Sequence, residues 1–146
     1  MYHHLILRVV TRALVGIIIL FGLYVQFHGD YSPGGGFQAG VIVAAGFILY
    51  AIVMGLGQAQ KVFPFWLAQK LMAIGVLIYA LVGVYSLIRG YEYLDYNALA
   101  PHHHKHGQHY GILIVEFGVG VTVVAVIMCV FYCFASRTPH MDDGEW

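Results

Sequence analysis

Four long apolar runs constrain this chain most, because each is long enough to cross the hydrocarbon layer of a membrane. They cover about residues 5–27, 33–55, 65–88 and 111–134. A transmembrane helix needs about 20 mostly apolar residues to span a layer about 30 Å thick, and a helix satisfies its own backbone hydrogen bonds in lipid. The sequence therefore predicts an all-α integral membrane protein, with residues 1–146 forming a single transmembrane domain of four helices.

Composition supports the same class. The chain is 60% hydrophobic and only 10% charged, whereas soluble proteins average about 25% charged residues. Its formal net charge is zero, which argues against a nucleic-acid partner, since phosphates require a concentrated basic surface. We expect the lipid bilayer, and no nucleic acid, to surround this protein.

The basic residues predict which side of the membrane each segment faces, because cytoplasmic segments carry more Lys and Arg. Five of the seven fall on the side of the two termini. Both termini are therefore expected to be cytoplasmic, with an outer loop at 89–110 and a cytoplasmic tail at 135–146, in the inner (cytoplasmic) membrane of a cell. The first apolar run also resembles a signal peptide, but no A-x-A-like cleavage site follows, so we expect it to be retained.

Residues 28–40, HGDYSPGGGFQAG, interrupt the apolar pattern between the first two runs. Ser32 and Pro33 are typical of a helix start. The three glycines at 34–36 are poor helix formers, each costing about 1 kcal/mol relative to alanine, which close approach of a neighbouring backbone would offset. A small residue then recurs every fourth position, a stripe that lets transmembrane helices pack closely. The stripe consists of Gly36, Gly40 and Ala44.

The pattern HGxxxPGGGF at 28–37 resembles the B-subunit (MnhB) family of multisubunit Mrp-type Na+/H+ antiporters. The segment EFGVGVTV at 116–123 is similar to a stretch in the last helix of that family. The resemblance implies a small subunit, not an enzyme and not the main proton-translocating subunit, in an assembly with other hydrophobic subunits that uses proton entry to expel Na+. The residues at 30–32 and the histidine-rich loop are not part of the family pattern, so the resemblance does not identify the transported cation.

Glu116 is the one acidic residue within the fourth apolar run. A charged carboxylate facing lipid costs several kcal/mol, so this side chain is expected to face protein, water or a partner subunit. Two interpretations remain open: Glu116 carries a proton or cation, or it only hydrogen-bonds another helix. The candidates for an ion path are Glu116, Asp30 and His28, and those for helix packing or the loop are Pro33, Gly34, Gly35, Gly36, Phe37, Gly40 and Gly120.

The outer loop is rich in histidine, with five of these residues between His102 and His109. Neutral imidazole is a common metal ligand, but the spacing is not specific and we expect a solvated loop with no metal site. No histidine lies within an apolar run, which argues against a haem-binding membrane protein, because axial ligands normally project from helices. We predict no cofactor. A purely structural membrane scaffold remains the main alternative to a subunit that takes part in transport.

Overall fold

The computed structural model describes residues 2–29, 34–99 and 104–137, and these residues form helices and connecting turns. Four of the helices are long and apolar enough to cross a membrane, which confirms the predicted fold class. The elements in chain order are α1 (Tyr2–Phe27), α2 (Gly36–Met54), α3 (Leu56–Val62), α4 (Phe65–Ile88), the short 3₁₀ helix η1 (Tyr96–Leu99) and α5 (His104–Ala135).

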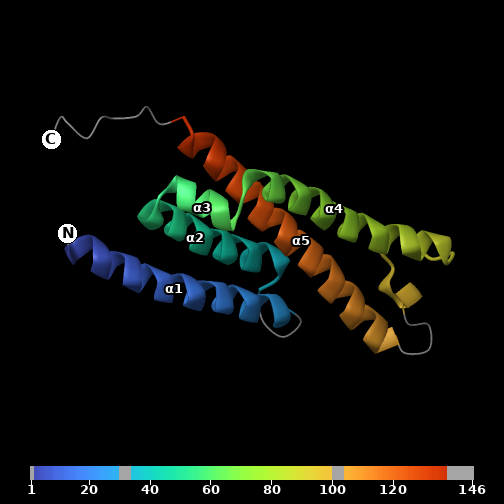
Figure 1. Ribbon diagram of the computed structural model, residues 1–146. Helices are drawn as coiled ribbons and strands as arrows, with labels where there is room; N and C mark the ends of the chain where they lie inside the picture. Colours follow the sequence, from blue (N-terminus) through green and yellow to red (C-terminus); the bar gives the residue numbers. More distant parts are fainter. Residues whose placement is uncertain (1, 30–33, 100–103, 138–146) are drawn as a thin grey trace.

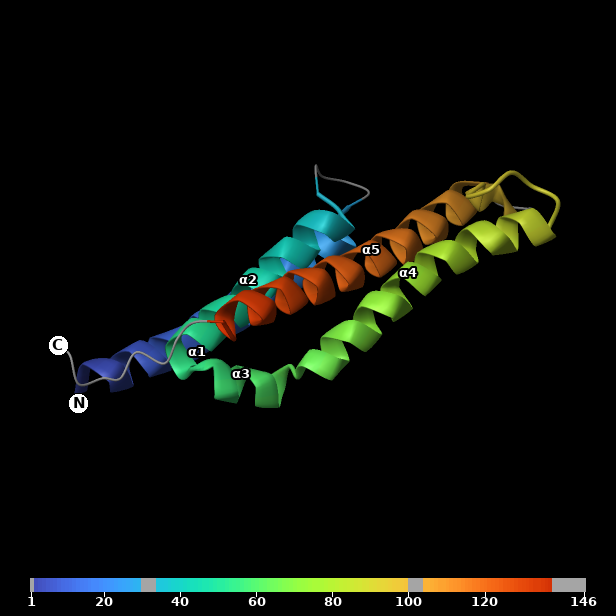
Figure 2. The same cartoon turned by 90° about the horizontal axis from the view of Figure 1, so that it is seen from above.

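Successive long helices run in opposite directions along the chain, and in space they form a curved row in the order α1, α2, α5, α4, in which the neighbours α2 and α5 run parallel. α2 packs against both α1 and α5, and α5 packs against both α2 and α4. α2 and α4 lie on opposite sides of α5 in both views (Figures 1 and 2). The start of α1 and the end of α5 lie at one end of the helix bundle, while the α1–α2 and α4–α5 connections lie at its other end (Figure 1). We call the latter the loop end.

Small residues form the contacts between the long helices. Large apolar side chains point outward from Leu5 to Phe27 of α1 and over much of α4, as expected for helices that are surrounded by lipid or other subunits. Close helix approach in lipid depends on small residues, because lipid tails are as apolar as leucine and leave packing as the main attraction. The buried small residues of α2 and α4 are Gly36, Ala39, Gly40, Ala44, Gly46, Ala51, Ala68, Gly75, Gly83 and Ser86.

The contact between α4 and α5 shows how close this approach is. A Cβ atom built on Gly75 would lie 2.7 Å from the carbonyl oxygen of Gly118 and would overlap the hydroxyl of Thr122. That hydroxyl donates a hydrogen bond of 2.8 Å to the Gly118 carbonyl within α5. The two backbones therefore touch directly, and a larger residue at either glycine would force the helices apart.

The connection between α2 and α4 contains a helix that the sequence did not predict. The sequence analysis assigned no helix between the runs at 33–55 and 65–88, but Leu56–Val62 forms the short helix α3. Gly55 has φ of 93°, a conformation that glycine adopts without strain, so the chain bends there and restarts as a helix. The hydroxyl of Tyr132 on α5 donates a hydrogen bond of 2.7 Å to the carbonyl of Phe63, which fixes this turn to α5.

The last helix begins earlier than its apolar run. We expected the outer loop to extend to residue 110 and the fourth helix to begin at 111, but α5 starts at His104. Hydropathy marks only the part of a helix that lies in the hydrocarbon layer, and α5 continues beyond it in polar residues. The second helix begins later than its apolar run, because α2 starts at Gly36 with Gly35 as its N-cap. Pro33, where we expected the helix to start, lies outside the described residues.

Candidate functional site

The carboxyl group of Glu116 occupies a space bounded by glycines at the loop end of α1 and α2. A Cβ atom on Gly35 would lie 2.7 Å from Glu116 Oε1, and one on Gly29 would lie 3.0 Å from the same oxygen and overlap Oε2. The carboxyl therefore fills the volume that a side chain at either glycine would need. Glu116 is half-buried, so α5 directs the acid toward its own protein.

The backbones of α2 and α5 touch at the same level. A Cβ atom on Gly36 would overlap the backbone carbonyl of Glu116, and one on Gly40 would lie 2.8 Å from the carbonyl oxygen of Gly120. Glycine at these positions is required by contact with a rigid backbone that cannot move aside as a flexible side chain could. Gly35 and Gly36 thus lie against Glu116, and Gly40 meets Gly120 one turn further along α5.

Gln26 is a member of this site that the sequence analysis did not single out. The side chain is only 7% exposed, and its Oε1 would lie 2.6 Å from a Cβ atom on Gly120. Within the described part of the chain, Gln26 Nε2 is buried without a hydrogen-bond partner. The available signal was a lone amide near the end of an otherwise apolar run, since polar groups at such positions normally face the interior of a bundle.

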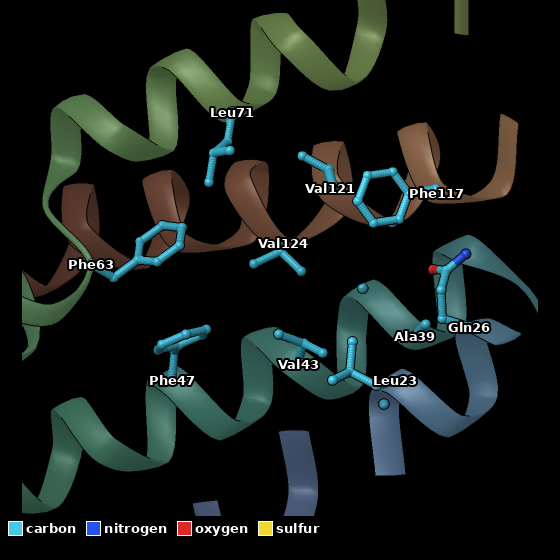
Figure 3. Close-up of a pocket in the computed structure, with 13 residues that line it drawn as sticks. Leu23, Gln26, Ala39, Val43, Phe47, Phe63, Leu71, Phe117, Val121 and Val124 are labelled. Atoms are coloured by element: carbon cyan, nitrogen blue, oxygen red, sulfur yellow. The ribbon is translucent and has the colours of Figure 1, made fainter. Parts of the chain in front are cut away.

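A cavity of about 220 Å³ extends from Gln26 between α1 and α2 on one side and α4 and α5 on the other. Figure 3 shows Phe117, Val121 and Val124 of α5 facing Val43 and Phe47 of α2 across it, with Gln26 at one end. Its lining is apolar apart from the Gln26 amide. A cavity of this kind does not attract water along its length, so the polar part of the site is confined to its Gln26 end.

The segment after α4 folds back over the loop end of α5 and brings Tyr96 close to the site. The Tyr96 ring packs where a side chain at Gly111 would otherwise lie. Burial raises the pKa of the Tyr96 phenol, and Tyr79 and Glu116 raise it further through electrostatic repulsion of the phenolate. Tyr96 therefore stays neutral well above pH 7, and Glu116 lies within electrostatic range of it.

Two contacts hold this returning segment in place. Gln108 donates a hydrogen bond of 3.2 Å from Nε2 to Asn97 Oδ1, and the buried Ser86 hydroxyl lies 3.0 Å from the backbone carbonyl of Asp95. Together they attach the turn that carries η1 to both α4 and α5. The position of Tyr96 is thus set by the fold, at the loop end where Glu116 lies.

Of the remaining predicted residues, the structure describes three. His28 is exposed; its ring stacks on Tyr24, with centroids 4.1 Å apart, and its Nδ1 lies 3.1 Å from the Tyr24 carbonyl. Phe37 is 63% exposed and points away from the bundle. Gly34 lines a shallow surface hollow together with Phe37. Asp30 and Pro33 lie outside the described residues.

The histidine-rich segment is described only in part. His102 and His103 fall outside the described residues, and His109 is exposed beside the ring of Tyr110. Among the residues whose placement is described, no three His, Cys, Asp or Glu side chains are close enough to hold a metal ion together. The site that the structure does assemble therefore consists of Glu116, Gln26 and the glycines between them.

Comparison with known proteins identifies the family. Residues 6–129 match the family described as "Domain related to MnhB subunit of Na+/H+ antiporter". A protein of Staphylococcus haemolyticus named "Putative antiporter subunit mnhB2" is 33% identical over 127 residues, covering 86% of this chain and 89% of that protein. The protein of the same name in Staphylococcus epidermidis is 34% identical over 131 residues, with the same coverage. This chain therefore belongs to the MnhB family of Na+/H+ antiporter subunits.

Proposed function

We propose that this protein is a small accessory subunit of a multisubunit Na+/H+ antiporter and that its Glu116 borders the path of the cation or proton. Membership of the MnhB family supports the first part. Together with four helices long and apolar enough to cross a membrane, this membership makes the chain a multi-pass protein of the cell membrane and a transporter subunit rather than an enzyme.

The observation that carries the second part is the position of the Glu116 carboxyl. It lies against Gly29 and Gly35 where three helices meet at the loop end, and the residue is half-buried. A carboxyl group within a membrane is costly and usually serves ion or proton movement. The carboxyl lies against glycines, which carry no apolar side chain, and the polar Gln26 amide lies about one helical turn away.

We further propose that other hydrophobic subunits cover much of the exposed surface of α1. Its outward side chains are large and apolar over almost its full length, and the helix packs chiefly against α2. A four-helix chain with one acid in its membrane core is too small for a complete antiporter, which needs two coupled or alternately exposed paths. Ion exchange is therefore expected only from the assembled complex.

Replacing Glu116 with glutamine tests the role of the acid. Glu116→Gln keeps the size and hydrogen-bonding capacity of the side chain but removes the titratable charge. We expect the complex to assemble normally, while Na+/H+ exchange in membrane vesicles falls or its pH profile moves by about one unit or more. The matched control is Glu92→Gln, which alters an exposed glutamate in the turn after α4 and should behave like the parent.

The same experiment separates transport from a scaffold role. If Glu116→Gln assembles and exchanges ions like the parent over the whole pH range, Glu116 only joins helices and the second part of the proposal is wrong. If the complex fails to form, the carboxylate itself is needed for assembly, which supports the scaffold interpretation instead.

A further inference from the structure

The buried amide of Gln26 has no role in the packing described so far. Its Nε2 atom is inaccessible to solvent and, within the part of the chain that is described, lacks a hydrogen-bond partner. A buried donor left without a partner is destabilising, because it has lost its hydrogen bonds to water without replacing them. Leucine or methionine would fill the same space between apolar helices without that cost, so the amide requires an explanation.

The surroundings of the amide offer few acceptors. The cavity on one side has an apolar lining apart from Gln26 itself. On the other side the amide faces the backbone of Gly120, where a Cβ atom would lie 2.6 Å from Gln26 Oε1 and 3.1 Å from the Gly36 carbonyl oxygen. An acidic side chain, that of Glu116, lies on α5 one turn before Gly120.

Glu116 and Gln26 lie about one helical turn apart along the contact between α1 and α5. Gln26 faces Gly120, and Gly29, three residues further along, faces Glu116. Glu116 and Gly120 are four residues apart on α5 and therefore lie on the same side of that helix, about 5–6 Å apart. The carboxyl is thus one turn nearer the loop end than the amide, a separation that rotation about the side-chain bonds of glutamate can cross.

We infer that Gln26 is a positioning residue for Glu116, whose amide receives the carboxyl when that side chain swings one helical turn inward from Gly29 and Gly35. This inference rests on the proposed function of Glu116. In the inward position the Gln26 N–H groups donate to the carboxylate, a charge-assisted hydrogen bond that is stronger than a neutral one. The swing moves a titratable group deeper into the membrane, which is the motion needed to carry a proton or cation along a path.

Other titratable groups near Glu116 come from three elements. Tyr96 of η1 and Tyr79 of α4 share its electrostatic environment, and His28 lies at the end of α1 with its ring against Tyr24. The loop-end half of α2 carries no titratable side chain. The tyrosines lie on η1 and α4, whereas Gln26 lies on α1. The Glu116 carboxyl would therefore have the Gln26 amide as its neighbour only in the inward position.

The test measures protonation of Glu116 directly, in the assembled complex in vesicles. Dicyclohexylcarbodiimide reacts with protonated carboxyl groups in apolar surroundings, and mass spectrometry of the peptide containing Glu116 gives the extent of reaction at each pH. Gln26→Leu removes the donor that favours the charged carboxylate. We expect the pH of half-maximal reaction to rise by about one unit. Gln38→Leu is the control, because Gln38 is exposed in the first turns of α2, and its midpoint should equal that of the parent.

A second variant guards against failure of assembly. Gln26→Met has nearly the same length and flexibility without the amide, and it should shift the midpoint in the same direction. An unchanged midpoint in whichever variant assembles overturns the inference, and so does a parent in which Glu116 does not react at any pH. The proposed function is judged separately: loss of exchange in Glu116→Gln together with an unchanged midpoint in Gln26→Leu would reject the role of Gln26 alone.

Discussion

At the scale of single residues, glycine sets the distance between α2 and α5. A Cβ atom on Gly36 would overlap the backbone carbonyl of Glu116, and one on Gly40 would lie 2.8 Å from the Gly120 carbonyl oxygen. Neither neighbour can move without moving its whole helix. The same closeness places the Glu116 carboxyl beside Gly35, so packing and the candidate site depend on the same few positions.

Gly36→Ala should destabilise the protein through steric overlap. Overpacking of a tight interior typically costs about 1–3 kcal/mol, and the overlap here is with backbone, so we expect a lower thermal unfolding temperature in detergent and less assembled complex. Gly16→Ala is the control, since no atom lies within 4 Å of a Cβ at Gly16 and alanine is the better helix former. Equal unfolding temperatures for the two variants would contradict the close approach at Gly36.

At the scale of elements, α5 organises the fold. It packs against α2 and α4 and also contacts η1. Near its C-terminal end, a cluster of Phe63, Ala68, Met128 and Tyr132 fixes the turn between α3 and α4. At its other end Tyr96 packs over Gly111. Glu116 therefore lies on the helix that is held at both ends, which keeps the acid in register with α1 and α2.

Tyr132→Phe tests the attachment of the α3–α4 turn. The Tyr132 side chain is 2% exposed, and its hydroxyl donates to the carbonyl of Phe63 over 2.7 Å. Removing the hydroxyl leaves that carbonyl without this donor, so we expect a loss of about 1–3 kcal/mol, seen as a lower unfolding temperature. Tyr110→Phe, at an exposed tyrosine of α5, should have no effect. A similar response of both variants would show that the hydrogen bond contributes nothing.

At the scale of the whole molecule, the row of helices puts the α1–α2 and α4–α5 connections at one end and the α2–α4 connection with α3 at the other (Figure 1). The excess of basic residues at the second end leads us to propose that it faces the cytoplasm. Under this orientation Glu116 lies in the outer half of the membrane.

Cysteine labelling tests this orientation. In a variant whose Cys129 and Cys133 are replaced by alanine, we would place single cysteines with Glu92→Cys at the loop end and Lys61→Cys on α3, both at exposed positions. A membrane-impermeant maleimide added to intact cells should label only Glu92→Cys. Inverted vesicles should give the opposite result and serve as the control for reactivity. Labelling of Lys61→Cys in intact cells would reverse the proposed topology.

The sequence was sufficient to predict the four membrane helices. Apolar runs of this length must become helices in lipid, because no water is available to satisfy the backbone. The motif at 28–37 and the segment from Glu116 also pointed to the family that the comparison with known proteins confirmed. These features are local, and a local pattern can be read without knowing which other helix lies beside it. The early start of α5 at His104 and the presence of α3 were missed because polar helical turns leave no hydropathy signal.

The tertiary structure alone decided which residues meet. Helical periodicity gives the face on which Glu116 lies, but not the helix that this face contacts. The arrangement of α1, α2 and α5 brings its carboxyl to Gly29 and Gly35, and brings the Gln26 amide to Gly120. His28 was an equally plausible partner by sequence, yet its ring stacks on Tyr24 instead. The neighbours of a membrane acid depend on how backbones pack through small residues, and that packing is a property of several segments together.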